Sequence, residues 1–114
     1  MSAILSVLVA VLHLGFMVLE SVLWATPTGR KVFRLSEEHA EITKTLASNQ
    51  GIYNAMLAVC ILWALYAGND GALTMLLAFV VVVGIYGAAT VSPAILVLQA
   101  APALLALIAQ QLGY

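Results

Sequence analysis

The stretch that decides the fold is Ser36–Met56, SEEHAEITKTLASNQGIYNAM, in which a polar segment passes into an apolar one. It contains three of the five acidic residues of the chain and one of its two histidines. It ends in a dense run of polar side chains: Asn49, Gln50, Tyr53 and Asn54. We predict that this stretch carries the chain from a cytosolic surface into a lipid bilayer, with the polar run just inside the membrane.

The composition is that of an integral membrane protein. The chain of 114 residues is 64% hydrophobic and only 8% charged, and its mean hydropathy is +1.10. A soluble domain carries about 25% charged residues, so this chain has too few charges to cover a water-facing surface. The net charge of −1 gives no indication of nucleic-acid binding. The single cysteine, Cys60, cannot form an internal disulfide.

Four apolar segments are long enough to cross a bilayer, which takes about 20 helical residues. The predicted spans are about 3–24, 49–66, 72–90 and 94–112, separated by short stretches rich in proline, glycine and asparagine. Short connections favour antiparallel neighbours. We therefore predict an all-α fold, a membrane-embedded antiparallel four-helix bundle that forms one domain over residues 1–114. Ser36 is a good N-cap for a helix from about Glu37, whose amphipathic first part forms a cytosolic extension before the second span.

Orientation follows from the basic residues. All four, Arg30, Lys31, Arg34 and Lys44, lie between the first and second spans. Basic residues favour the cytosolic side, so residues 25–48 should be cytosolic and both termini should face outward. The N-terminal segment lacks a basic region and a small-x-small cleavage site. We expect it to be a retained span of a multi-pass inner-membrane protein.

Each span places polar side chains in its cytosolic half. Glu20 lies roughly 6 Å from the cytosolic end of the first span, at 1.5 Å per residue, and His13 lies two turns away on the same face. An ionisable residue inside a membrane is a candidate functional residue. Glu20 and His13 are therefore candidate catalytic residues for proton transfer. The candidate ligand-binding residues are Asn49, Gln50, Tyr53, Asn54, Tyr86, Thr90 and Gln99.

These residues predict a polar small-molecule site in the cytosolic half of the bundle, for acid–base chemistry on, or binding of, a lipophilic molecule. The same residues also fit purely structural roles. Glu20 could pair with Arg30 or Lys31 at the interface, and the amide side chains could hold helices together. The motif Gly84-x-x-Gly87 indicates close helix packing.

The chain also resembles a known family. The resemblance is carried by His13 through Glu20 to Trp24, by Thr26-Pro27-x-Gly29-Arg30-Lys31-Val32-Phe33, and by Asn49-Gln50-Gly51-x-Tyr53-Asn54. These segments are similar to domain-of-unknown-function family 1304, small bacterial four-span membrane proteins. The resemblance covers essentially the whole chain. It implies a four-helix inner-membrane protein, and it implies no established activity.

Three other functions remain open at this point. A small-molecule or proton-coupled transporter would require an oligomer, because four spans are few, and Gly84 and Gly87 offer a surface for a second copy. A haem protein would use His13 as an axial ligand, although no Cys/His cluster has metal-ligand spacing and no metal site is predicted. A structural protein would dock partners on the amphipathic residues 36–48. The expected partners are the lipid bilayer, a lipophilic molecule and a second copy, but no nucleic acid.

Overall fold

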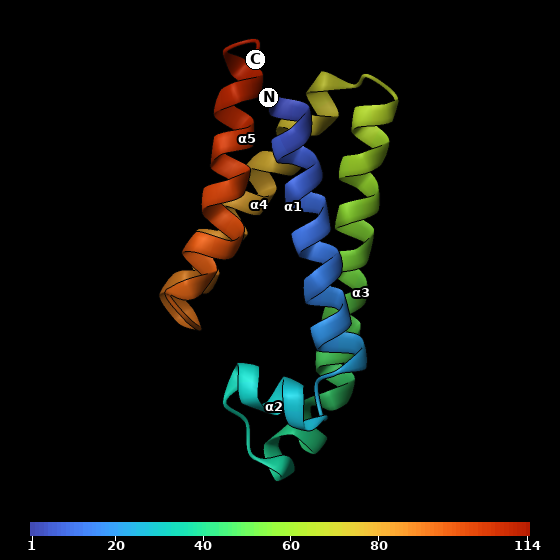
Figure 1. The fold of residues 1–114 in the computed structure, drawn as a ribbon, viewed down its shortest axis with the longest axis vertical. Coiled ribbons are helices and arrows are strands. Elements are labelled where there is room, and N and C mark those ends of the chain that lie inside the picture. The colour runs from blue at the N-terminus through green and yellow to red at the C-terminus, as the bar shows by residue number, and fades with distance from the viewer. The chain divides into compact units, whose positions relative to one another are not determined.

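The computed structural model describes all 114 residues, which form helices and no strand. The prediction of an all-α fold is therefore confirmed. The elements are α1 (Ser2–Met17), the π-helical turn η1 (Val18–Val22), α2 (Pro27–Phe33), α3 (Glu37–Tyr66), α4 (Asp70–Thr90), the π-helical turn η2 (Leu96–Ala100) and α5 (Ala101–Gln111) (Figure 1). The chain divides into two compact units, residues 1–12 with 58–114 (unit 1) and residues 13–57 (unit 2). Each is described by itself.

Helix starts follow local capping signals. The hydroxyl of Ser36 accepts a hydrogen bond from the backbone N–H of His39 at 3.1 Å, so α3 begins where the sequence predicted. The side-chain oxygen of Asn69 accepts from the N–H of Ala72 at 3.0 Å and caps α4. A side-chain oxygen at the N-cap satisfies one of the backbone donors that the first turn leaves unpaired. These two helices thus begin for reasons that are visible in the sequence.

The segment after the first predicted span contains a short helix that was not predicted. The helix of the first span ends at Val22, and Pro27 begins the short helix α2. Proline suits the first helical position because the N–H that it lacks has no partner there. Thr26 caps the helix by accepting from the N–H of Gly29 at 3.3 Å. Arg34, in the left-handed conformation with φ 55°, ends it.

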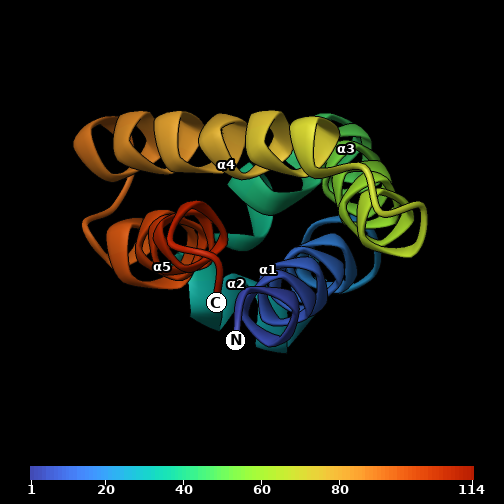
Figure 2. The same ribbon diagram turned by 90° about the horizontal axis from the view of Figure 1, so that it is seen from above.

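Unit 1 is organised around the contact of α4 with η2 and α5, which lie side by side in Figure 2. The buried residues of α4 recur every three or four positions, as one helix face requires: Leu73, Leu77, Val80 and Gly84. The buried residues of α5 are all small: Ala103, Ala106 and Ala109. Small side chains allow two helix backbones to approach closely.

Gly84 marks a close approach between two elements of unit 1. A Cβ atom added there would lie 2.8 Å from the backbone nitrogen of Ala100 in η2 and 2.9 Å from its Cβ. The prediction that the Gly84-x-x-Gly87 motif packs closely against a helix is confirmed. The motif packs on the chain's own η2, however, so Gly84 does not provide a surface for a second copy.

The π-helical form of η2 has a local cause. Pro102 has no N–H to offer the carbonyl of Leu98, four residues earlier, so the regular ladder cannot be completed. The N–H of Ala101 instead bonds to the carbonyl of Leu96, five residues back. A turn of this kind typically forms where the ladder is interrupted.

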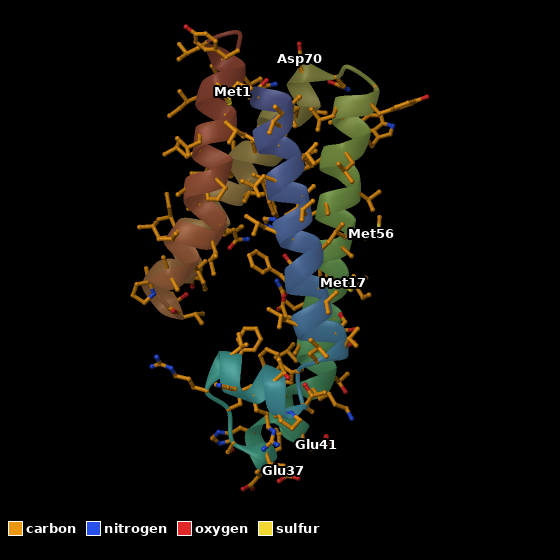
Figure 3. All side chains as sticks on the ribbon, in the orientation of Figure 1. Met1, Met17, Glu37, Glu41, Met56 and Asp70 are labelled. Atoms are coloured by element: carbon orange, nitrogen blue, oxygen red, sulfur yellow. The ribbon has the colours of Figure 1, made fainter.

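Two helical stretches, Ser2–Val22 and Asp70–Thr90, are long and apolar enough to cross a membrane by length and composition. Only 22% of each apolar stretch is buried within the chain. Leu96–Gln111 is apolar but shorter. In α3 the first turns are acidic, at Glu37 and Glu41, and the apolar part follows toward Met56 (Figure 3). The two long apolar helices indicate association with a membrane.

Candidate functional site

A carboxylate–amide pair joins two elements of unit 2. Glu20 lies in η1, and Asn54 lies in the middle of α3. The side-chain amide of Asn54 donates a hydrogen bond to the Oε1 atom of Glu20 at 2.5 Å. Asn54 is only 9% exposed, so this bond forms among apolar helices. Two of the predicted site residues, 34 positions apart in the chain, are therefore brought together.

The pair is held by a close approach of η1 to α3. A Cβ atom added to Gly51 would overlap the hydroxyl oxygen of Ser21 and would lie 3.1 Å from the backbone carbonyl oxygen of Met17. The same hydroxyl of Ser21 donates to the backbone carbonyl of Ser48 at 2.9 Å. Gly51 thus serves as the contact point of the two elements, and this contact places Glu20 opposite Asn54.

His13, the second candidate for proton transfer, is fully buried. Its ring meets the ring of Phe16 edge to face, with centroids 5.1 Å apart. This arrangement suits the quadrupoles of two aromatic rings. The structure therefore encloses His13 fully, and its role in proton transfer stays a prediction.

Two other candidates on α3 do not share the burial of Asn54. Gln50 is exposed, and Tyr53 is 72% exposed. The buried face of this part of α3 instead carries small residues at helical spacing: Ala47, Gly51 and Ala58 beside Asn54. A spacing of three or four residues is compatible with either side of that stripe, which is why the sequence did not separate these side chains.

The three remaining candidates belong to unit 1. Tyr86 is 71% exposed, and the hydroxyl of Thr90 donates to the backbone carbonyl of Tyr86 at 2.8 Å. Gln99 is partly buried within η2. Glu20 and Asn54 are part of unit 2, so the contribution of these three residues to one site stays a prediction.

Trp24 is a residue whose contacts the sequence did not reveal. Its indole N–H donates to the hydroxyl oxygen of Thr43 on α3 at 3.0 Å, and that hydroxyl donates to the carbonyl of His39 at 2.7 Å. The indole also lies against the ring of Phe33 at the end of α2, with centroids 4.6 Å apart. Through these two contacts, Trp24 connects α2 to α3.

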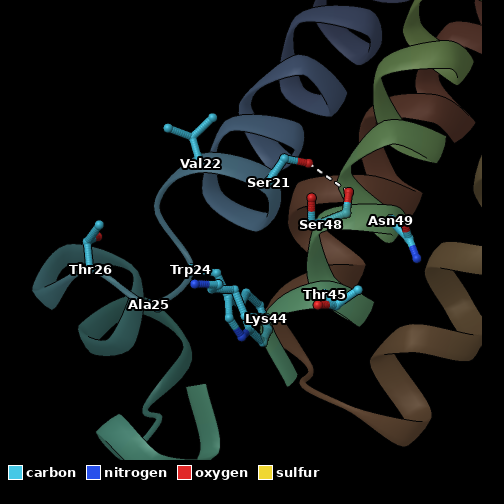
Figure 4. Close-up of a pocket in the computed structure, with 9 residues that line it drawn as sticks. All are labelled: Ser21, Val22, Trp24, Ala25, Thr26, Lys44, Thr45, Ser48 and Asn49. Carbon is cyan, nitrogen blue, oxygen red and sulfur yellow. Dashed lines mark hydrogen bonds between the residues drawn. The ribbon is translucent and has the colours of Figure 1, made fainter. Parts of the chain in front are cut away.

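A cavity of about 530 Å³ opens between the end of η1 and the second to fourth turns of α3 (Figure 4). Its lining residues are Ser21, Val22, Trp24, Ala25, Thr26, Lys44, Thr45, Ser48 and Asn49. Of the predicted ligand-binding residues, Asn49 is the one that lines it. The sequence signal for the others on α3 is their spacing: positions 44, 45, 48 and 49 fall on one helix face.

Among the other Asp, Glu, Lys and Arg side chains of unit 2, Arg30 is half-buried and the rest are exposed. Glu41 and Lys44, three residues apart on α3, form an ion pair with 3.5 Å between Oε2 and Nζ. More than half of each side chain is exposed, so the pair contributes little to stability. No group of three or more His, Cys, Asp or Glu side chains is placed to hold a metal ion.

The fold and the site thus define a small all-α protein with long apolar helices and a half-buried carboxylate–amide pair. The model of the family described as "Protein of unknown function (DUF1304)" matches residues 7–110, and the chain belongs to this family. "Uncharacterized protein YpaA" of Lactococcus lactis subsp. lactis (strain IL1403) is 32% identical over 112 residues, which cover 95% of this chain and 94% of that relative. No solved structure matches the chain.

Proposed function

We propose that the chain is a multi-pass inner-membrane protein that binds a lipophilic small molecule at Glu20 and Asn54. The observation that carries this proposal is the hydrogen bond between these side chains at 2.5 Å. A carboxylate and an amide among apolar helices are costly unless they find partners. In this pair, each side chain offers one group to the other and retains another for a ligand.

The chemistry of the pair defines the ligand. Glu20 uses Oε1 to accept from Asn54, which leaves Oε2 available to accept a hydrogen bond or a proton. Asn54 keeps a second N–H and its carbonyl oxygen. A lipophilic molecule with a hydroxyl, amine or carbonyl group matches this set of donors and acceptors. Beyond binding, we propose that Glu20 acts as a general acid or base toward the ligand, with His13 as the second ionisable group.

The membrane placement has two kinds of support. Only 22% of the apolar stretch in each of Ser2–Val22 and Asp70–Thr90 is buried by the chain itself, as is expected of lipid-facing helices. All four basic residues fall within 25–48, which favours a cytosolic position for that segment. We propose an antiparallel four-helix bundle with spans at about 3–24, 49–66, 72–90 and 94–112 and with both termini outward.

Single-cysteine labelling tests this topology. Cys60 is the one native cysteine, so Cys60→Ala gives a background into which Glu38→Cys or Gly71→Cys is introduced. A membrane-impermeant maleimide should label position 71 in intact spheroplasts. It should label position 38 only after the membrane is opened. Labelling of both positions in intact spheroplasts, or labelling in the reverse order, would refute the proposed topology.

Native mass spectrometry with lipid extraction tests the ligand site. A non-phospholipid molecule should copurify with the wild type and be lost in Glu20→Gln and in Asn54→Leu, which removes the amide but keeps the volume similar. Glu38→Gln makes the same chemical change as Glu20→Gln at an exposed position and should retain the molecule. Equal retention in all four proteins, or no such molecule in the wild type, would contradict the site.

A further inference from the structure

The cavity between η1 and α3 is distinct from the Glu20–Asn54 pair, because neither residue lines it. Its two walls differ in chemistry (Figure 4). The wall from the end of η1 and the following turn includes the apolar side chains of Val22, Trp24 and Ala25. The wall from α3 presents only polar or charged side chains: Lys44, Thr45, Ser48 and Asn49. A molecule with one polar end and one apolar end would match both walls.

Three of the four side chains of the polar wall are hydrogen-bond donors that have no acceptor within the chain. The hydroxyls of Ser21 and Thr26 already donate to backbone carbonyls. By contrast, the side chains of Thr45, Ser48 and Asn49 have no hydrogen bond within the chain. Hydroxyl and amide groups that line a cavity without such a bond can donate to the oxygen atoms of a ligand.

The charge of the lining favours an anion. Lys44 is the one charged residue of the lining, and no carboxylate lines the cavity. The nearest acidic partner is Glu41, at 3.5 Å from the ammonium group of Lys44 on the exposed surface. An exposed pair of this kind is weak, so an anion in the cavity can compete with it. An ammonium group with neighbouring hydroxyls is a recurrent arrangement for phosphate oxygens.

We propose that this cavity binds a phosphate group, with Lys44, Thr45 and Ser48 as its donors and with the apolar wall against the remainder of the ligand. Two sources share this chemistry, the headgroup of an anionic phospholipid and a free phosphate ester. The lipid source rests on the membrane placement proposed above, because Trp24 and Lys44 would then lie at the cytosolic interface, where tryptophan and lysine are commonly found.

Binding is measured by native mass spectrometry of the full chain in detergent, with three added probes. Dioleoylphosphatidylglycerol carries both phosphate and acyl chains, dioleoylglycerol lacks the phosphate, and glycerol 3-phosphate lacks the chains. Binding of the first probe alone supports a lipid headgroup, and binding of glycerol 3-phosphate as well supports a site for free phosphate esters. Equal binding of dioleoylglycerol and the phospholipid, or no binding of either phosphate-bearing probe, would overturn the proposal.

The matched variants are Lys44→Gln and Lys31→Gln, which remove the same charge inside and outside the cavity. Lys44→Gln should weaken binding by about tenfold or more, because it removes a charge-assisted hydrogen bond, whereas Lys31→Gln should change it by less than about twofold. Ser48→Ala provides a second, uncharged test and should weaken binding severalfold. Equal effects of the two lysine variants would overturn the site. The probes are added and none of the variants changes Glu20 or Asn54, so failure of this experiment does not contradict the ligand site proposed at Glu20.

Discussion

The contact of Gly84 with η2 leads to a prediction about stability. Replacing Gly84 by alanine would place a Cβ atom 2.8 Å from the backbone nitrogen, 2.9 Å from the Cβ and 3.0 Å from the Cα of Ala100. These atoms belong to the main chain or are fixed to it, so no side-chain rotation can relieve the overlap. The helices α4 and η2 would have to move apart, and the buried stripe around Leu77 and Val80 would loosen with them.

The size of the effect follows from two opposing terms. Glycine to alanine inside a helix gains about 1 kcal/mol from backbone entropy. Inserting a methyl group into a packed contact costs about 1–3 kcal/mol. Gly15→Ala isolates the first term, because nothing lies within 4 Å of the added Cβ atom. Gly84→Ala should therefore be less stable than Gly15→Ala by about 1–3 kcal/mol, since the propensity gain cancels in the comparison.

A third variant makes the comparison graded. The Cβ atom added in Gly87→Ala would lie 3.2 Å from the Cγ2 atom of Ile95, and that side chain can shift by a few tenths of an ångström. Its stability should fall between those of the other two. The assay is equilibrium unfolding in mixed detergent micelles, followed by circular dichroism. If all three variants shift the midpoint equally, or if Gly84→Ala is the most stable, the close approach of α4 to η2 is refuted.

Two further predictions concern unit 2. Gly29→Ala should release α2 from its position, because the added Cβ atom would overlap the backbone carbonyl of Leu23. Limited proteolysis should then cut the segment 25–36 faster than in the wild type. An unchanged cleavage rate would count against this packing. Trp24→Phe should lower the free energy of unfolding by about 1 kcal/mol, the net value of a typical hydrogen bond, because the bond to Thr43 is lost. Trp63→Phe, at a position 54% exposed, is the control and should have a smaller effect on the unfolding midpoint.

The features that the sequence predicted well depend on near neighbours. The cap at Ser36 acts on the backbone N–H group of a residue three positions later. Such signals are complete within one turn of helix, so no tertiary information is needed. The glycines at 84 and 87 predicted close packing for a related reason, because small residues recurring on one helix face permit it.

The features that the sequence did not predict depend on pairing between distant segments. The indole of Trp24 donates to Thr43, which lies 19 positions away in the chain. The residue type alone is equally compatible with a position at a lipid interface. On α3, the difference between buried Asn54 and exposed Tyr53 depends on which face meets η1. That register is set by Gly51 against Ser21, a contact that helical periodicity alone does not specify.

The candidate site shows the same division. Glu20 was recognisable because a carboxylate is rare in an apolar helix, and Asn54 because it ends a polar run. The sequence placed both residues in the cytosolic halves of their spans, but it did not show that their side chains form a hydrogen bond. The cavity lined by Lys44 and Ser48 was missed as a site, because its polar wall was interpreted as the solvent-facing side of an amphipathic helix.

The π-helical turn η1 has a consequence for the evolution of the family. The N–H of Leu23 bonds to the carbonyl of Val18, five residues back, so this turn holds one residue more than an α-helical turn. It therefore has the form of a one-residue insertion. In a relative that lacks that residue, an ordinary helix would form, and the side chains on one side of the turn would rotate by about 100° against those on the other. A single-residue gap at 18–22 would then mark the family members in which the carboxylate no longer faces α3.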